Sequence, residues 1–372
     1  MDPLVSLVIP CYKHAHFLSE CVTSILAQTH QNFEILIMDN CSPDNTPEVA
    51  RSFHDPRVRY FRNEVNIGHV RNFNKGIMMS RGKFVCLVPA DDYLRNPDVL
   101  DRFVKILDRN PHVGYVFSRA FEVQGTKEIG IAHWTDCGNR DRIWNGSTFL
   151  KRLIKSDCIV MASAMVRKEC FDKIALLSVD LPHACDWYLW CLFALHYQVA
   201  YVSQPMVCCR IHEESLTTSL NRDSAPICIV DELNVLWRVA LEAERAARPS
   251  FRSLCNASIA NHAAHAIMSG PAGATRAGLN EQEFEAMVRV NARDAKDKND
   301  LWASVYRVLG DEQYWDGHPG EAMRSYSLAL KLRPWRPKVW AKYILLWTGQ
   351  FGTIIRRLCA SSAVAARLKE HP

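Results

Sequence analysis

In the segment FVCLVPADD, residues 84–92, five apolar residues are followed, after Pro89 and Ala90, by a pair of adjacent carboxylates. Its apolar part has the length and composition of a strand that is buried on both faces. Similar runs occur upstream at residues 5–10, 33–38 and 58–61, and helical patterns separate the four runs at residues 17–28, 44–53 and 72–81. This alternation predicts an α/β domain with a mostly parallel sheet that helices cover on both faces.

Polar residues follow three of the four predicted strands. The first strand runs into Tyr12, the second into Asp39, and the fourth into Asp91 and Asp92. The carboxyl ends of parallel strands meet at one edge of a sheet, where open α/β sheets bind their ligands. The sequence therefore predicts one site that combines an aromatic ring with two acidic clusters.

Asp91 and Asp92 are candidates for a metal site. Adjacent carboxylates repel each other, and their burial is unfavourable unless a cation neutralises them. Mg²⁺ and Mn²⁺ prefer carboxylate and phosphate oxygens, so such a cation would bridge the protein and a diphosphate. The alternative is an ordinary turn or helix N-terminus, where aspartates are common. His212 is a further candidate ligand, although a single histidine is more often structural.

Tyr12, Asp39 and Arg71 are candidates for binding a nucleotide. Asp39 would accept a hydrogen bond from the imide N–H of a uracil or thymine ring, and Tyr12 would stack on that ring. Arg71 would pair with phosphate. The ordinary alternatives are a turn cap for Asp39 and a surface position for Arg71.

Asp186 is the single acid in the segment ACDWYLW, residues 184–190. Burial among these large apolar residues would raise the pKa of its carboxyl, which suits a general base that works near neutral pH. The alternative role is to cap the helix that follows, and one residue can do both.

The second half of the chain, from about residue 221, predicts only helices. We expect them at residues 227–247, 251–268, 281–294 and 354–369. Residues 308–340 resemble one tetratricopeptide helical hairpin. We therefore expect two domains, with a catalytic α/β domain over residues 1–220 and a helical domain over residues 221–372.

The basic residues gather near the C-terminus. The chain has 45 Lys and Arg against 40 Asp and Glu, but residues 321–372 hold 10 basic and 2 acidic residues. Aromatic residues, among them Trp335, Trp340 and Trp347, lie between these charges. An aromatic face with basic flanks is typical of peripheral membrane contact, and the alternative is that these rings pack between the last helices and the catalytic domain. The pattern does not favour nucleic-acid binding, which needs regular interleaving of aromatic and basic residues.

The cysteines and the chain's beginning bear on the compartment. Fourteen cysteines are present, but none forms a CxxC pair, and the first residues show no secretory signal. We expect reduced thiols and a cytoplasmic protein, with peripheral contact at the inner face of the membrane as the basic region implies.

Taken together, these motifs resemble the family 2 inverting glycosyltransferases with the GT-A fold, from about Val5 to Thr218. Six segments occur in the family's order, at residues 6–13, 38–46, 66–74, 87–94, 186–189 and 210–215. Two departures are Lys13, where the family has Asn, and Pro89, which replaces the first Asp of the Asp-x-Asp motif. The metal would therefore rely on Asp91 or Asp92.

The resemblance implies roles for residues of this chain. Asp186 would be the general base, Asp91, Asp92 and His212 would hold Mn²⁺ or Mg²⁺, and donor binding would fall to Pro10, Tyr12, Asp39, Asn66, Arg71, Asn72 and Asp91. The donor would be a nucleotide-sugar, with a UDP-sugar favoured, and the acceptor a hydroxyl of a glycan or lipid-linked molecule in surface polysaccharide or glycan biosynthesis. Two alternatives stay open: a sugar nucleotidyltransferase, which usually has a glycine-rich loop that is missing after the first strand, and a non-catalytic helical adaptor.

Overall fold

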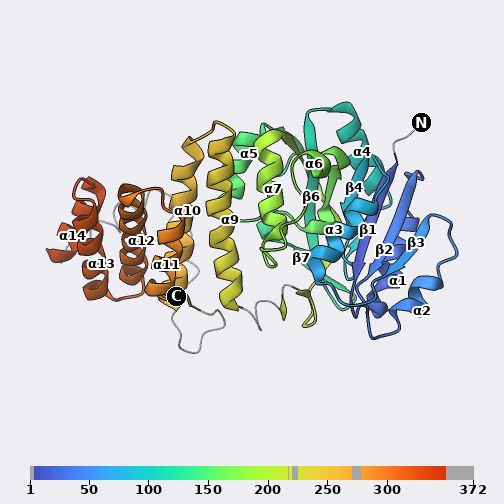
Figure 1. Cartoon of the computed structure of the whole chain (residues 1–372), viewed down its shortest axis with the longest axis horizontal. Helices are drawn as coiled ribbons and strands as arrows, with labels where there is room; N and C mark the ends of the chain where they lie inside the picture. The colour runs from blue at the N-terminus through green and yellow to red at the C-terminus, as the bar shows by residue number, and fades with distance from the viewer. Residues whose placement is uncertain (1–3, 217, 220–224, 270–277, 349–372) are drawn as a thin grey trace. The chain divides into compact units, whose positions relative to one another are not determined.

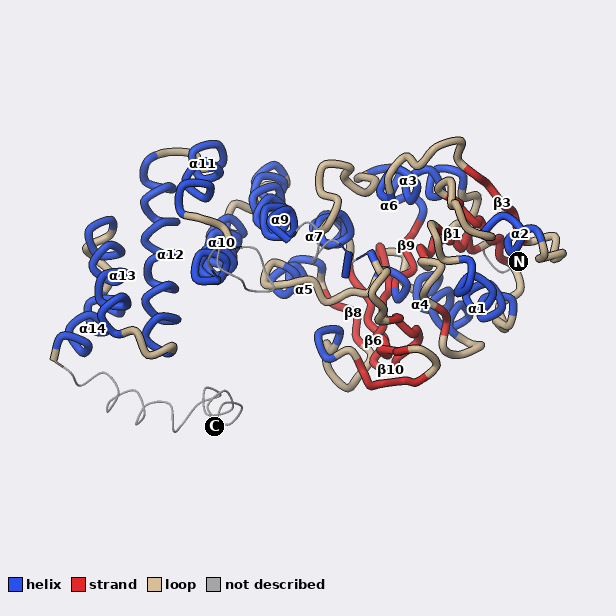
Figure 2. Tube along the Cα trace, turned by 90° about the horizontal axis from the view of Figure 1, so that it is seen from below, coloured by secondary structure: helices blue, strands red, loops and turns tan. Residues whose placement is uncertain are grey.

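The computed structural model describes residues 4–216, 218–219, 225–269 and 278–348. It divides into two compact units, Met1–Cys255 and Asn256–Pro372. Figure 2 shows that the strands belong to the first unit, whereas the described part of the second unit consists of helices. The predicted α/β fold with a helical C-terminal region is confirmed, while the predicted functional boundary at residue 220 stays a prediction.

One mixed sheet runs through the first unit (Figure 1). Its strand order is β3 (Val58–Arg62), β2 (Phe33–Asp39), β1 (Val5–Cys11), β4 (Phe84–Leu87), β9 (Ala164–Arg167), β6 (Val113–Gln124), β10 (Gln198–Arg210) and β5 (Tyr93–Leu94). Two further strands, β7 (Lys127–Ile131) and β8 (Arg142–Trp144), pair with β6 and β10. Strands β1 to β4 are mutually parallel, and β9 is antiparallel to both β4 and β6. Because β10 is parallel to β6, it runs in the same direction as β1 and β4.

Helices alternate with these strands as the sequence predicts. They are α1 (Ala15–Leu26), α2 (Thr46–Arg51), α3 (His69–Met79), α4 (Val99–Arg109), α5 (Gly146–Leu153), α6 (Lys168–Lys173), α7 (Cys185–His196) and α9 (Ala225–Arg245). In α1 the buried residues recur at helical spacing, at Ala15, Leu18, Cys21, Val22 and Ile25. This stripe packs into the core, which explains why a 12-residue segment holds a stable helix.

The core of the first unit lies around the central strands. Every residue of β1 and of β2 is buried, which is the signature of strands covered on both faces. Helix α3 approaches β1 closely at Gly76, where an added Cβ would lie 2.3 Å from Val8 Cγ1. A larger residue at position 76 would therefore separate the helix from the sheet. This packing holds the strand ends that carry the site.

The second unit contains α11 (Glu281–Asn291), α12 (Ala295–Trp315), α13 (Pro319–Leu332) and α14 (Pro337–Trp347), while α10 (Ser250–Ser269) spans the division between the units. Helices α12 and α13 pair closely, because Gly310 lets the buried ring of Tyr326 approach the α12 backbone. A helix pair thus occupies much of residues 308–340, and its assignment as a tetratricopeptide unit stays a prediction. The helix predicted at residues 354–369 lies outside the described residues.

Two properties bear on the predicted compartment. The cysteines in the described part of the chain are free thiols, most of them buried. Among the described residues, no helix is both long enough and apolar enough to cross a membrane.

Candidate functional site

Three strand ends bring together a compact group of ligating side chains. His14 follows β1, Asp91 follows β4 and His212 follows β10. These strands run in the same direction, so their carboxyl ends share one edge of the sheet. One donor atom from each of the three residues lies within 4.8 Å of the others. The sequence predicted Asp91 and His212 for this site.

Asp91 lies between the two histidines. Its Oδ2 is 3.1 Å from His212 Nε2, and its Oδ1 is 3.9 Å from His14 Nδ1. Burial alone would raise the pKa of Asp91, but the hydrogen bond with His212 and the nearby His14 hold that pKa below its usual value. Burial lowers the pKa of His14, which favours the neutral imidazole that binds metals. The group therefore combines a carboxylate with imidazole nitrogens.

This donor set fits a divalent cation. Two imidazole nitrogens and one carboxylate oxygen suit first-row transition metals such as Mn²⁺ better than Mg²⁺, which prefers oxygen ligands. His14 was not predicted as a ligand, although Tyr12 in the same segment was a candidate for nucleotide binding. Its position just after the first strand, at the edge where ligands bind, is the signal that would have found it.

Asp92 is not part of this group. It is buried, and its Oδ1 accepts a hydrogen bond from the backbone N–H of Arg210 at 3.0 Å. Burial and the negative charge of Asp91 raise its pKa well above the usual value, so the protonated form is favoured. The Arg210 guanidinium in turn donates to the backbone oxygens of Asp91 and Gly125 and to the carboxylate of Glu20. Asp92 and Arg210 thus position the Asp91 loop against β10.

Asp39 closes β2 at the same edge and is fully buried. Its Oδ2 accepts a hydrogen bond from Tyr60 Oη at 2.7 Å, and its Oδ1 accepts one from the backbone N–H of Ser42 at 2.8 Å. Each carboxylate oxygen has a second lone pair for another donor. Tyr12 is 38% exposed beyond the end of β1, so its ring is accessible to a ligand. The predicted pairing of both residues with a base stays a prediction.

Lys13 is one of the two departures from the pattern of the family that the motifs resemble. It has a φ of +63°, a left-handed conformation that most side chains disfavour. Asparagine adopts this conformation more readily than lysine, which accounts for the family's preference at a tight turn. The turn itself forms with Lys13, and its backbone N–H donates to Ser42 Oγ.

Four asparagines form a network beside Asp39. Asn72 donates to the backbone oxygen of Met38, Asn63 donates to both Asn72 and Asn40, and Asn40 donates to Asn66. The network fastens the loops after β2 and β3 to the start of α3. Asn66 and Asn72 were predicted to bind the donor, and in the structure their amides hold these loops. Their direct contact with a ligand stays a prediction.

The remaining predicted donor residues lie close to this edge in the chain. Pro10 is buried within β1, and its backbone oxygen accepts a hydrogen bond from the Ala90 N–H, which fixes the residue before Asp91. Arg71 is exposed on α3 and has no hydrogen-bond or ion-pair partner in the described part of the chain. Its guanidinium is therefore available to an anion.

Asp186 lies in the first turn of α7, and a second carboxyl, Asp157, lies near it. Burial raises the pKa of Asp186, and burial together with the charge of Asp186 raises the pKa of Asp157 well above its usual value. Asp157 Oδ1 accepts hydrogen bonds from the backbone N–H groups of Cys158 and Ile159. Burial therefore favours the protonated form of both carboxyls, and the charge of Asp186 favours it further at Asp157. Asp157 was not predicted, although an acid before an apolar run was a usable signal.

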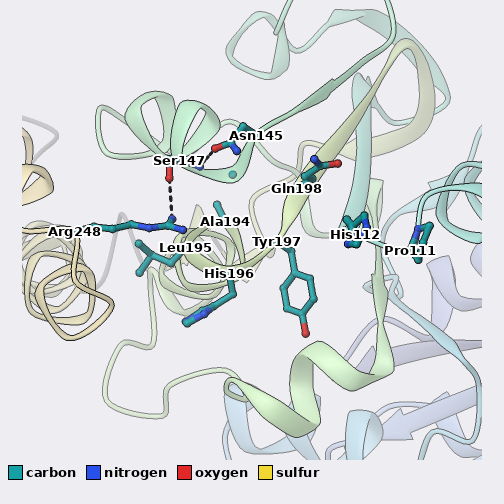
Figure 3. Close-up of a pocket in the computed structure, with 11 residues that line it drawn as sticks. Pro111, His112, Asn145, Ser147, Ala194, Leu195, His196, Tyr197, Gln198 and Arg248 are labelled. Carbon is teal, nitrogen blue, oxygen red and sulfur yellow. Dashed lines mark hydrogen bonds between the residues drawn. The ribbon is translucent and has the colours of Figure 1, made fainter.

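A separate polar cavity of about 340 Å³ lies elsewhere in the first unit. Figure 3 shows Arg248 in this cavity, where its guanidinium donates to Ser147 Oγ at 2.8 Å. His112 precedes β6 and Gln198 begins β10, so the cavity adjoins the amino ends of these strands. It is therefore on the opposite edge of the sheet from His212 and is not the predicted site.

Comparisons with known proteins agree with the fold and the motifs. Residues 6–175 match Glycosyl transferase family 2. An uncharacterized glycosyltransferase of Rickettsia typhi is 26% identical over 239 residues, which are 63% of this chain and 71% of that protein. Glycosyltransferase GlyG of Streptococcus pneumoniae is 33% identical over 115 residues, which are 30% of this chain and 38% of that protein.

One solved structure has a similar fold over most of this chain. TarS of S. aureus, residues 1–349, in complex with UDP-GlcNAc, is 16% identical, and the similarity covers 95% of this chain and 91% of that chain with a TM-score of 0.55. The fold is therefore the GT-A fold, followed by a helical C-terminal region. The region that matches Glycosyl transferase family 2, residues 6–175, includes the four predicted strands from Ser6 onward and the Asp91 motif.

Proposed function

We propose that this protein transfers a sugar from a nucleotide-sugar to a hydroxyl acceptor, with inversion at the anomeric carbon. The observation that carries the proposal is the convergence of His14, Asp91 and His212 from three strand ends. A site for a divalent cation at the carboxyl edge of a GT-A sheet is where a donor diphosphate needs its charge balanced. The adaptor alternative does not require this group of ligating side chains.

The chain's own residues account for the transfer. Asp186 accepts the proton of the acceptor hydroxyl, whose oxygen forms a bond to the anomeric carbon. The bond from that carbon to the donor phosphate breaks, and the nucleoside diphosphate leaves with the electron pair. Burial and the charge of Asp186 raise the pKa of Asp157 well above its usual value, which favours its neutral form beside the base. A base with a raised pKa matches this step, because proton transfer is most effective when the pKa is near the working pH.

The cation would be held by His14, Asp91 and His212, and we propose Mn²⁺ rather than Mg²⁺ because two of the three ligands are imidazoles. When bound, it supplies positive charge that stabilises a diphosphate leaving group. Arg71, exposed and without a partner among the described residues, supplies a further positive charge.

We propose a UDP-sugar as the donor. Asp39 and Tyr12 offer an acceptor and an exposed ring to a uracil base. The TarS neighbour was solved with UDP-GlcNAc, which supports this nucleotide without identifying the sugar. We further propose residues 1–220 as the catalytic domain, a tetratricopeptide-like pair at residues 308–340, and action on glycans or lipid-linked acceptors at the cytoplasmic side.

Titration calorimetry of UDP, dTDP and GDP with and without Mn²⁺ tests the donor site. We expect Mn²⁺-dependent binding of UDP to the wild type and about tenfold or more weaker binding to His14→Ala, because the variant loses a ligand. The matched control is His16→Ala, since His16 is exposed and outside the group. Absence of nucleotide binding by the wild type would refute the donor site and favour the adaptor alternative.

A further inference from the structure

Helix α14 has an apolar stripe that packs inside the second unit. Val339 is buried, and Tyr343 and Leu346 pack with it against the core formed by α13. Their spacing of four and three residues places them on one side of the helix. This stripe is sufficient to hold α14 in place.

A neighbouring stripe of α14 has no such cover from the residues that the structure describes. Trp340, Ile344 and Trp347 have the same helical spacing and are 42%, 50% and 74% exposed. Trp335, in the turn before the helix, is 96% exposed. We call these four residues the aromatic stripe. The aromatics of this region therefore divide, since Tyr343 packs inside the second unit, whereas the aromatic stripe is exposed among the described residues.

The sequence around the aromatic stripe is rich in basic residues. Residues 322–369 contain ten Lys and Arg and no Asp or Glu. Within the described part, Arg333 and Lys342 pair with acids of α12, whereas Lys331 and Lys338 are exposed. The stripe thus combines large exposed apolar rings with basic side chains that remain open to a negatively charged partner.

We propose that the aromatic stripe binds the surface of an anionic membrane. Tryptophan favours the membrane–water interface, where its apolar ring is buried and its N–H stays hydrated. Basic side chains beside it are attracted by anionic headgroups. A second copy of the chain fits less well, because pairing two such faces would bring like charges together. The basic segment after Thr348 also fits the stripe less well, because its positive charges would repel the basic residues beside the stripe. The inference does not depend on the proposed transfer reaction.

Vesicle flotation of the full chain tests this proposal. We expect binding to phosphatidylcholine vesicles that contain phosphatidylglycerol, weak binding to pure phosphatidylcholine, and loss of binding at high salt. The double variant Trp335→Ala with Trp347→Ala should bind about tenfold or more weakly, since burial of one large apolar side chain is worth at least that factor. The control is Val290→Ala, an 84% exposed residue of α11 outside the stripe.

Three results would overturn the proposal. The first is equal flotation of the wild type and the double tryptophan variant, with both folded by circular dichroism. The second is flotation that is lost only when residues 349–372 are deleted, which would assign the contact to that segment. The third is a wild type that fails to float but self-associates in light scattering, with self-association lost in the tryptophan variant. That result would assign the stripe to a second copy.

Discussion

Asp91 and Asp186 are both partly buried carboxylates of the first unit, yet their surroundings shift their pKa values in opposite directions. Burial raises the pKa of each. Two histidines reverse this effect at Asp91, whereas Asp186 has another acid, Asp157, beside it. The comparison teaches that neighbours rather than burial assign the roles: one carboxylate is prepared for a cation and the other for a proton.

The largest expected effect is on kcat, at the proposed general base Asp186. Asp186→Asn removes the proposed base, so we expect kcat to fall by about 10²- to 10⁴-fold. UDP binding should be unchanged, because the residue has no part in the His14–Asp91–His212 group. Release of UDP from a UDP-sugar measures the rate. Asp180→Asn, on an exposed side chain, is the matched control, and near-normal turnover by Asp186→Asn would assign the base to another residue.

A smaller effect is expected at the cation site, where two adjacent aspartates give a matched pair. Asp91→Asn should weaken Mn²⁺-dependent UDP binding by about 10- to 100-fold, because a carboxylate ligand becomes a neutral amide. Asp92→Asn should leave it nearly unchanged, since an amide oxygen still accepts the Arg210 N–H. Titration calorimetry compares the two variants. Equal losses would show that both aspartates serve the cation, as the sequence left open.

The pH dependence of turnover tests the raised pKa of Asp186, which distinguishes it from Asp91. Asp186 must be ionised to accept a proton, and its pKa lies above the ordinary 3.8. We therefore expect kcat at saturating donor and Mn²⁺ to fall as the pH drops through a midpoint above 3.8, with full activity on the alkaline side. A pH series with circular dichroism at each point excludes unfolding as the cause. A midpoint at or below 3.8 would contradict the raised pKa.

The sequence predicted Asp39 and Asp91 from their positions at the ends of apolar runs, because parallel strands bring their carboxyl ends to one edge of the sheet. His212 was proposed only as a single candidate ligand, and His14, which also follows a strand, was missed. The sequence did not predict Asp157 beside Asp186, because 29 residues separate them and only tertiary packing brings them together. The antiparallel strand β9 was missed for a similar reason. Strand pairing over long separations depends on packing more than on local pattern.

The smallest effect is expected on the free energy of unfolding, at Asp157, the acid near Asp186. A buried acid whose pKa is raised by folding costs stability above its unfolded pKa, because the unfolded chain releases the proton more readily. Asp157→Asn removes this cost and keeps an oxygen for the Cys158 and Ile159 N–H groups. We expect the variant to be more stable at pH 7, because its amide has no proton whose release favours the unfolded chain. The gain should vanish as the pH falls below about 3.9, where the acid is protonated in both states. Urea unfolding at both pH values measures it, and a variant that is less stable at pH 7 would mean that the Asp157 carboxylate is ionised and stabilised in the fold.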